Sequence, residues 1–383
     1  MCFCLRYVDD NTVFEDFVGF AQLGKEDLTG EGIAAQITEK LHELGLSTAG
    51  LVGLGFDGAS NMSGQFKGAQ AVIKRHQPMA HYVHCASHSL NLALTKASAI
   101  IPIRDCWSRI HEVVNFFRAS AARKELLPRP LHQLCDTRWV ERHDAVVVFL
   151  AIFPQVVEAL ETIREHWSSP GNAASLLLAI SSSEFVVALV VLSKVLATTH
   201  GLSVSLQARQ MNLSEACQLV EVSRGQIQSW RDAAVDTLNG WWPEVVELGR
   251  SAGLDEIKMP RKPRNQRNRT NVPAENAIDH YRRATLIPFL DGILSELKER
   301  FSKHFEALAS FEPLLPARIA GKTFADAKPT TEFRHLPAEE RGDIEQAFNP
   351  YTKCRSNFQK RRRKRLPPIV DRRNLPEDYQ KTA

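Results

Sequence analysis

The stretch "LVGLGFDGASNMSG", residues 51–64, decides the predicted fold, because a short apolar run ends at one aspartate, Asp57, and then breaks into small residues. Such a run is typical of a buried strand. Binding sites in α/β sheets form at the carboxyl ends of strands, and hard divalent cations prefer oxygen ligands. Asp57 could therefore hold a metal ion. The alternative is a turn-forming or helix-capping aspartate, which the local pattern alone favours.

The segments around this stretch predict an α/β layer over roughly the first hundred residues. Two alternating strands come first, followed by helices that alternate with short apolar strands. Thr29 is a suitable N-cap for the first helix, and Gly45 is suited to end it. The expected strands are residues 2–9, 12–23, 51–57 and 80–85, and the expected helices are residues 29–46, 68–77 and 87–101.

After about residue 105 the strand patterns stop, and helical patterns continue to residue 250. Helices are expected over residues 107–120, 144–167, 175–207 and 213–238. The most apolar of these segments, residues 173–197, has Glu184 at its centre, and a central carboxylate costs about 3 kcal/mol in a bilayer. We therefore expect a buried helix pair there and no membrane partner. The predicted fold class is α/β plus α.

Composition and cysteine usage bound the class of protein. The chain has 383 residues, enough for two domains, and 44% of them are hydrophobic. Its seven cysteines are scattered and odd in number, which fits a reducing compartment better than a disulfide framework. Residues 1–10 contain no long apolar run, so they are not expected to be a signal peptide.

The net charge of +4 conceals two basic blocks. Residues 258–269 hold six Lys or Arg and residues 355–365 hold seven, with no acid in either, and the rest of the chain has 35 basic against 44 acidic residues. Clustered cations attract anionic partners or import receptors, although a merely solvated segment is the alternative for the first block. The candidate basic patches are Lys258, Arg261, Lys262, Arg264, Arg267, Arg269, Lys360, Arg361, Arg362, Arg363, Lys364 and Arg365.

Two further motifs carry polar chemistry. In "HYVHCASHSLNLAL", residues 81–94, Cys85 and His88 are expected beside Asp57 at the same sheet edge. Cys and His are zinc ligands, but no second pair follows at zinc-finger spacing, so we expect no bound zinc. In "LCDTRWVERHDAV", residues 134–146, the guanidinium of Arg138 and the ring of Trp139 could contact phosphate and stack on an unpaired base. This second stretch alone favours a buried Trp with a surface Arg.

Together, "LRYVD", "FEDFVGF", "TGEGIA", "LVGLGFDGASNMSGQFKGAQAVI", "YVHCASHSLNLAL" and "DTRWVERHDAV" resemble the transposase domain of the hAT superfamily. The likeness is greatest to the domesticated branch found in MYM-type zinc-finger proteins and in the repressor of the inhibitor of the protein kinase. It covers roughly residues 3–305 and includes "HYRRATLIPFLDGILSELKERF", residues 280–301. The resemblance implies a ribonuclease-H-like sheet layer interrupted by a large helical insertion domain.

The resemblance also implies roles for individual residues. Asp57 matches the second carboxylate of the family's metal-binding triad, and Cys85 and His88 match its Cys-x-x-His motif. Arg138 and Trp139 match the Arg-Trp motif, whose ring stabilises a flipped base. The implied divisions are a partial ribonuclease-H-like core over residues 1–105, a helical insertion over 106–257, a basic linker over 258–275, a family-like helical segment over 276–310 and a divergent, disordered basic tail over 311–383.

The departures from the family pattern shape the functional expectation. The family's first carboxylate belongs to a strand upstream of the segment that starts at Met1, and no "ERSFS"-like motif with the third carboxylate follows residue 305. The chain is thus expected to be truncated at both ends, without the family's dimerisation segment. One carboxylate of three cannot hold two ions for strand transfer.

We therefore expect a transposase-derived nuclear protein that is catalytically inactive and needs no cofactor. Mg²⁺ or Mn²⁺ would be expected if the missing carboxylates were restored. The expected partners are DNA or nuclear proteins and an import receptor, and dimerisation is not expected. Two alternatives stay open: an active transposase that uses two-metal strand cleavage and transfer, and a non-functional truncated gene product.

Overall fold

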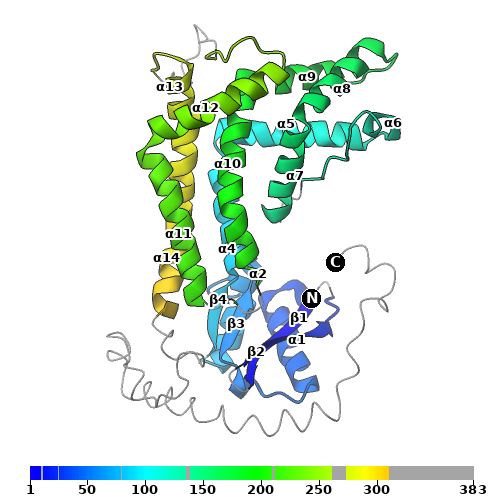
Figure 1. Cartoon of the computed structure of the whole chain (residues 1–383). Helices are drawn as coiled ribbons and strands as arrows, with labels where there is room; N and C mark the ends of the chain where they lie inside the picture. Colours follow the sequence, from blue (N-terminus) through cyan, green and yellow to red (C-terminus); the bar gives the residue numbers. More distant parts are fainter. Residues whose placement is uncertain are drawn as a thin grey trace. The chain divides into compact units, whose positions relative to one another are not determined.

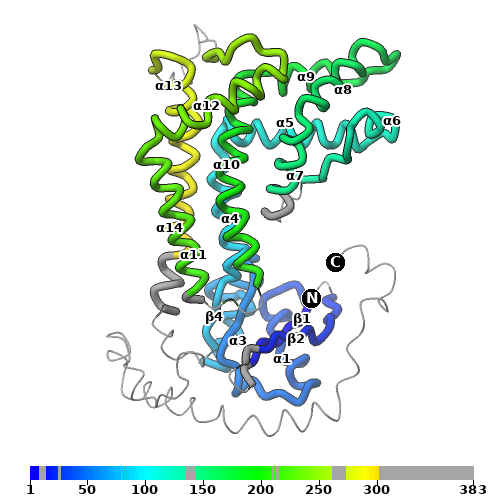
Figure 2. Tube along the Cα trace, in the orientation of Figure 1, coloured from blue at the N-terminus to red at the C-terminus, as the bar shows by residue number. Residues whose placement is uncertain are grey.

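A computed structural model describes residues 1–9, 12–24, 26–78, 80–134, 139–208, 211, 213–260 and 273–309 (Figures 1 and 2). The chain divides into two compact units. Of the described residues, one unit contains Met1 and residues 21–306, and the other contains residues 2–20 and 307–309.

Residues 2–20 form the predicted antiparallel pair of strands, β1 (Cys2–Asp9) and β2 (Thr12–Phe20). The register places Asp9 opposite Thr12, so the two strands pair in the order that the predicted hairpin requires. The Tyr7 hydroxyl donates a 2.7 Å hydrogen bond to the Asp16 carboxylate, and the Tyr7 ring stacks on that of Phe14. Cross-strand aromatic contacts of this kind stabilise a hairpin.

The larger unit begins with a small α/β segment. Thr29 caps the first helix by accepting a hydrogen bond from the Gly32 N–H, and Gly45 follows that helix with a φ of 70°, so both predicted boundary signals are confirmed. Ile33, Ile37 and Leu41 form its buried stripe. The elements are η1 (Glu26–Leu28), α1 (Gly30–Glu43), η2 (Thr48–Gly50), β3 (Gly53–Phe56), α2 (Ser60–Ser63), α3 (Ala69–His76) and β4 (His81–His84).

Strands β3 and β4 pair in parallel, and β1 and β2 form a separate two-stranded sheet. The prediction that β3 is buried is wrong, since Leu54 is buried while Gly53 and Gly55 are exposed. The reason is that β3 pairs with one strand and its two glycines have no side chains to cover either face. The ribonuclease-H-like layering of these strands stays a prediction.

From residue 86 to residue 309 every regular element of the described chain is a helix, which confirms the predicted change from α/β to α. The helices are α4 (Ala86–Ala97), α5 (Ile101–Arg118), α6 (Ala121–Lys124), α7 (Trp139–Ala151), α8 (Phe153–His166), α9 (Ala173–Ile180), α10 (Ser183–Ser205), α11 (Leu213–Asp232), α12 (Ala234–Ser251), α13 (Ala277–Tyr281), the π-helical turn η3 (Arg282–Leu286) and α14 (Ile287–Ala309).

Two segments that the sequence predicts as single helices, residues 144–167 and 213–238, are broken. Pro154 lies in the first turn of α8, where a missing N–H costs nothing, whereas inside a continuous helix it would remove a hydrogen bond. The break before Pro154 turns the chain by 68° between α7 and α8. The second break, at Ala233 between α11 and α12, has no proline or glycine at it.

Helix α10 is the centre of the helical core. It packs against α5, α7, α11 and α12, and α9 precedes it, so the predicted buried helix pair over residues 173–197 is confirmed (Figure 1). By length and composition α10 could cross a membrane, but 67% of its most apolar window is buried in the protein. Ser182 caps its start by accepting a hydrogen bond from the Phe185 N–H.

Charged side chains connect the outer helices. Helices α11 and α14 run side by side, and Arg231 of the former pairs with Asp291 of the latter (Figures 1 and 2). Glu296 of α14 is only 6% exposed, and its carboxylate forms ion pairs with Lys96 of α4 at 2.6 Å and with Arg300 at 3.1 Å. A buried carboxylate needs such partners, so this cluster fixes α4 against the family-like segment over residues 280–301.

Candidate functional site

Asp57 and Cys85 lie at the same edge of the β3–β4 sheet. The parallel register pairs Phe56 with His84, and the next residue on each strand is therefore Asp57 or Cys85. The Cys85 N–H donates a 2.8 Å hydrogen bond to the Phe56 carbonyl, which extends the pairing by one step. The structure thus brings these two predicted site residues together at the carboxyl ends of adjacent strands.

The Asp57 carboxylate stabilises a turn and faces solvent. Its Oδ1 accepts a 3.2 Å hydrogen bond from the Ala59 N–H two residues on, which is the geometry of an Asx-turn, and its side chain is exposed. The Tyr82 hydroxyl donates to the Asp57 carbonyl at 3.4 Å. Burial, together with the negative charge of Asp57, raises the pKa of Tyr82. The structure therefore shows the turn-forming role predicted for Asp57, and the exposed carboxylate keeps a free oxygen that a metal ion could reach.

Two imidazoles lie close to Gly58, the residue after Asp57. A β-carbon at position 58 would stand 2.7 Å from His84 Nε2 and 3.3 Å from His88 Nε2, so only glycine fits without displacing a ring. The His84 and His88 rings are 5.6 Å apart between centroids. Gly58 is one of the small residues that the sequence places directly after Asp57 to leave room at this edge, and the two imidazoles occupy that room. This edge therefore gathers a carboxylate, a thiol and two imidazoles.

The second predicted site falls largely outside the structure's description. Arg138 lies outside the described residues, and Trp139 is the first residue of α7. Of the basic patches, Lys258 is described: its N–H donates to Ser183 Oγ at 3.0 Å, and its ammonium pairs with Glu256 at 3.4 Å. The patch residues outside the described chain are Arg261, Lys262, Arg264, Arg267, Arg269, Lys360, Arg361, Arg362, Arg363, Lys364 and Arg365.

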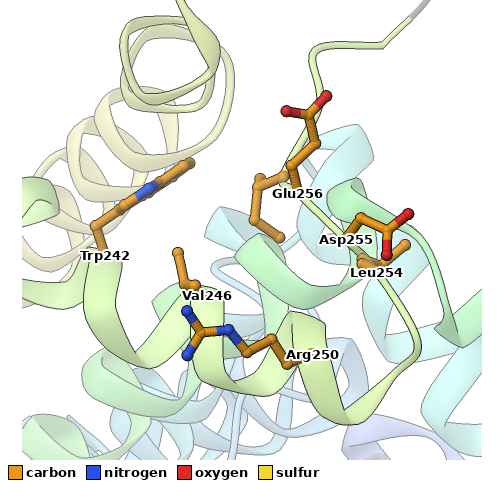
Figure 3. A pocket seen from close by; sticks show the side chains of 7 residues that line it. Trp242, Val246, Arg250, Leu254, Asp255 and Glu256 are labelled. Carbon is orange, nitrogen blue, oxygen red and sulfur yellow. The ribbon is translucent and has the colours of Figure 1, made fainter.

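A pocket of about 250 Å³ lies beside α12 (Figure 3). Trp242 stands on one side of it and Asp255 and Glu256 on the other, with Arg250 below Val246 in this view (Figure 3). This pocket could not be predicted from the sequence, because its wall forms only where the chain folds back after α12. One guanidinium and two carboxylates give it no clear preference for anions, and none of its residues belongs to a group of three metal ligands.

Within the part of the chain that the structure describes, one group of side chains could offer three ligand atoms to a metal ion: His143, Asp144 and His200. It involves α7 and α10 rather than the sheet edge. Asp57, Cys85 and His88 do not belong to it. His143 and Asp144 are adjacent in the sequence, where they have no predicted role. Their approach to His200 depends on the tertiary packing of two helices.

Comparison with known proteins agrees with the resemblance seen in the sequence. Residues 1–68 match the family model described as DUF4371, the ZMYM1/FAM200, RNase-like domain. The chain is 25% identical over 329 residues to the mouse 52 kDa repressor of the inhibitor of the protein kinase, and 24% identical over 328 residues to the human protein of the same name.

Each of these alignments covers 79% of this chain, and the chain spans 43% and 42% of the length of the two relatives. No solved structure matches the chain significantly. The matches confirm the resemblance to the domesticated branch and support homology to a transposase-derived repressor family.

Proposed function

We propose that this chain acts in the nucleus by binding DNA or protein partners and does not cut DNA. The observation that carries the proposal is the state of Asp57: its carboxylate is engaged by the Ala59 N–H, and no three-ligand group within the described residues includes it. Two-metal strand cleavage needs several ligands that converge on a shared pair of ions. A single carboxylate that holds an Asx-turn supports a structural role instead.

The names of the relatives also support a binding function without DNA cleavage. The mouse and human proteins are named as repressors, and repression is an activity that binding can supply without chemistry. We infer that the ribonuclease-H-like layer of this chain is retained as a scaffold, with Cys85 and His88 tying the end of β4 to the start of α4. No cofactor is needed for this function.

Cleavage is the sharpest test of the proposal. The purified chain is incubated with supercoiled plasmid and labelled duplex in Mg²⁺ or Mn²⁺, beside Asp57→Ala and the matched surface variant Asp255→Ala. We expect no nicking above the level of the Asp57→Ala protein. Nicking that Asp57→Ala abolishes and Asp255→Ala preserves would contradict the proposal and favour the alternative of an active transposase.

Nucleic-acid contact is tested separately. If Arg138 and Trp139 bind DNA, alanine at both positions should weaken binding to single-stranded DNA more than to duplex, because base stacking needs an accessible base. Contacts from the basic patches should instead weaken steeply with salt and show no sequence preference. Binding that is unchanged by both sets of alanines, measured by fluorescence anisotropy, would leave protein partners as the remaining class.

Nuclear import is expected to depend on residues 360–365. A run of six cations suits the acidic groove of an import receptor. A fluorescent fusion too large to diffuse through nuclear pores should accumulate in the nucleus, and the same fusion with these six residues as alanine should not. Equal nuclear signal from both proteins would exclude this segment as the import signal.

A further inference from the structure

We propose that His143, Asp144 and His200 bind one zinc-type divalent ion between α7 and α10. His143 and Asp144 lie in the "DTRWVERHDAV" stretch, but the function proposed above assigns no role to any of these three residues, so the proposal does not depend on it. The proposed metal site lies in the helical part of the chain, away from the Asp57 and Cys85 edge of the β3–β4 sheet.

The distances fit the edges of a tetrahedral metal complex. Asp144 Oδ1 lies 3.1 Å from His143 Nδ1 and 3.8 Å from His200 Nε2. Ligands about 2.0–2.1 Å from a tetrahedral ion are separated from one another by about 3.3 Å. The observed separations lie on either side of that value, and one ligand atom from each residue can be chosen so that all lie within 4.8 Å of one another. Because the coordinating lone pair of an imidazole lies in the plane of its ring, at least one of the two stacked rings must rotate about its side-chain bonds to complete the site.

Two packed helices hold these ligands in place. His143 and Asp144 are consecutive residues of α7, and His200 comes from α10, which packs directly against α7 (Figure 1). The two imidazoles stack with centroids 4.1 Å apart and planes 27° from parallel. Their approach does not depend on a flexible loop.

The burial of the three side chains suits an ion that keeps one water ligand. The histidine side chains are 15% and 30% exposed, so they are partly desolvated, whereas Asp144 is 53% exposed and leaves access for the ion and a fourth ligand. Three protein ligands with an open fourth position is a common zinc arrangement.

The donor set selects the class of ion. Two imidazole nitrogens and one carboxylate oxygen suit Zn²⁺ and neighbouring transition metals, whereas Ca²⁺ and Mg²⁺ prefer six or more oxygen ligands. The negative charge of Asp144 also favours a cation here, because its carboxylate oxygen lies close to both imidazole rings. A metal ion could then accept a lone pair from each of the three groups. Zn²⁺ is therefore the probe of choice, and Mg²⁺ is its negative control.

The test is a titration of the chelator-treated full chain with ZnCl₂, followed by calorimetry and, with CoCl₂, by visible absorption. We expect one ion per chain and a tetrahedral cobalt spectrum. His143→Gln, His200→Gln and Asp144→Asn should each weaken binding at least about tenfold, because even the outer partners of metal ligands are worth 10–100-fold. The matched controls are His166→Gln, an exposed histidine on α8, and Cys85→Ser at the sheet edge, which should leave binding unchanged.

A second measurement needs no variant. Because the ion would link two helices, Zn²⁺ should slow amide hydrogen exchange in α7 and α10 of the unaltered chain and leave α1 unaffected. Absence of zinc binding tighter than millimolar, unchanged affinity in both His200→Gln and Asp144→Asn, or loss of binding in Cys85→Ser would overturn the proposal. Loss in Cys85→Ser alone would instead assign zinc to the Cys85 and His88 edge, against the expectation stated from the sequence.

Discussion

Two regions of the larger unit differ in how much apolar surface they bury: the helical part, residues 86–301, and the α/β segment, residues 26–85. The largest fully buried side chains in the described chain all lie between Leu90 and Phe289. The buried apolar residues of the α/β segment are smaller and fewer: Ile33, Ala34, Ile37, Leu41, Leu54, Ala69, Ile73 and Ala80. Since apolar burial is the main favourable term in folding, the helical part holds most of the stability.

This difference teaches where function and stability reside. The carboxylate, thiol and imidazole groups of the family's motifs gather at the exposed edge of the thinly packed α/β segment, whereas the thick helical core has its polar pairs on its outer helices. All six tryptophans lie at or beyond Trp107, so tryptophan fluorescence follows the helical part alone. Amide hydrogen exchange can follow both regions, and thiol labelling can compare single cysteines in each.

The largest contrast is expected between two cysteines. Cys106 of α5 is 1% exposed, and burial raises the pKa of its thiol, whereas Cys85 at the sheet edge is exposed. Only the thiolate reacts, and a buried thiol must wait for the fold to open. Cys106 should therefore be alkylated at least about a thousandfold more slowly than Cys85, as a stability of about 5 kcal/mol or more implies. Comparable alkylation rates, measured by peptide mass spectrometry, would contradict the stated difference in packing between the two regions.

A large truncation in the helical core should come next. The Phe153 ring is fully buried between those of Phe149 and Phe185, so Phe153→Ala should lower the free energy of unfolding by about 3–5 kcal/mol. The exposed Leu178 of α9 provides the matched truncation, Leu178→Ala, which should change stability by less than about 0.5 kcal/mol. Urea unfolding followed by tryptophan fluorescence measures both, and similar effects would show that the core is not where the burial indicates.

A backbone contact sharpens the comparison in the α/β segment. A β-carbon on Gly30 would lie 1.9 Å from the Lys67 carbonyl oxygen, so Gly30→Ala should push α1 away from α3 at a cost of about 1–3 kcal/mol. Gly50→Ala is the control, because nothing lies within 4 Å of a β-carbon there. Faster hydrogen exchange in α1 and α3 with an unchanged tryptophan transition is expected. A shift of that transition by the same free energy would mean that both regions unfold as one.

The smallest expected effect concerns pH. Burial and the nearby charge of Lys74 lower the pKa of His81 at the start of β4. Because the folded chain then binds this proton less readily than the unfolded chain, the contribution of His81 is present above pH about 6.5 and is lost as the pH falls through the lower folded value. Exchange in β3 and β4 should therefore be faster in the unaltered chain than in His81→Gln at pH 5.5, and nearly equal at pH 7.5. Equal rates at both values would exclude this dependence.

Local chemistry explains why so many element boundaries could be predicted from the sequence. Thr29 and Gly45 mark the ends of α1 because a side-chain cap and a positive φ are properties of single residues. The parallel strands β3 and β4 bring Asp57 and Cys85 to one edge, which follows from strand order. The helix break near Pro154 was equally local, and it was missed because apolar periodicity continues across it.

By itself the sequence determined the order of elements, the change from α/β to α and the gathering of Asp57 with Cys85 and His88 in one region, since each depends on nearby residues. Only the tertiary structure decided that β3 is largely open, because burial depends on what covers a strand. It also decided that the Asp57 carboxylate serves the Ala59 N–H, and that residues 143 and 200 meet. A contact between residues 57 positions apart is set by how α7 packs on α10, and no local pattern contains that information.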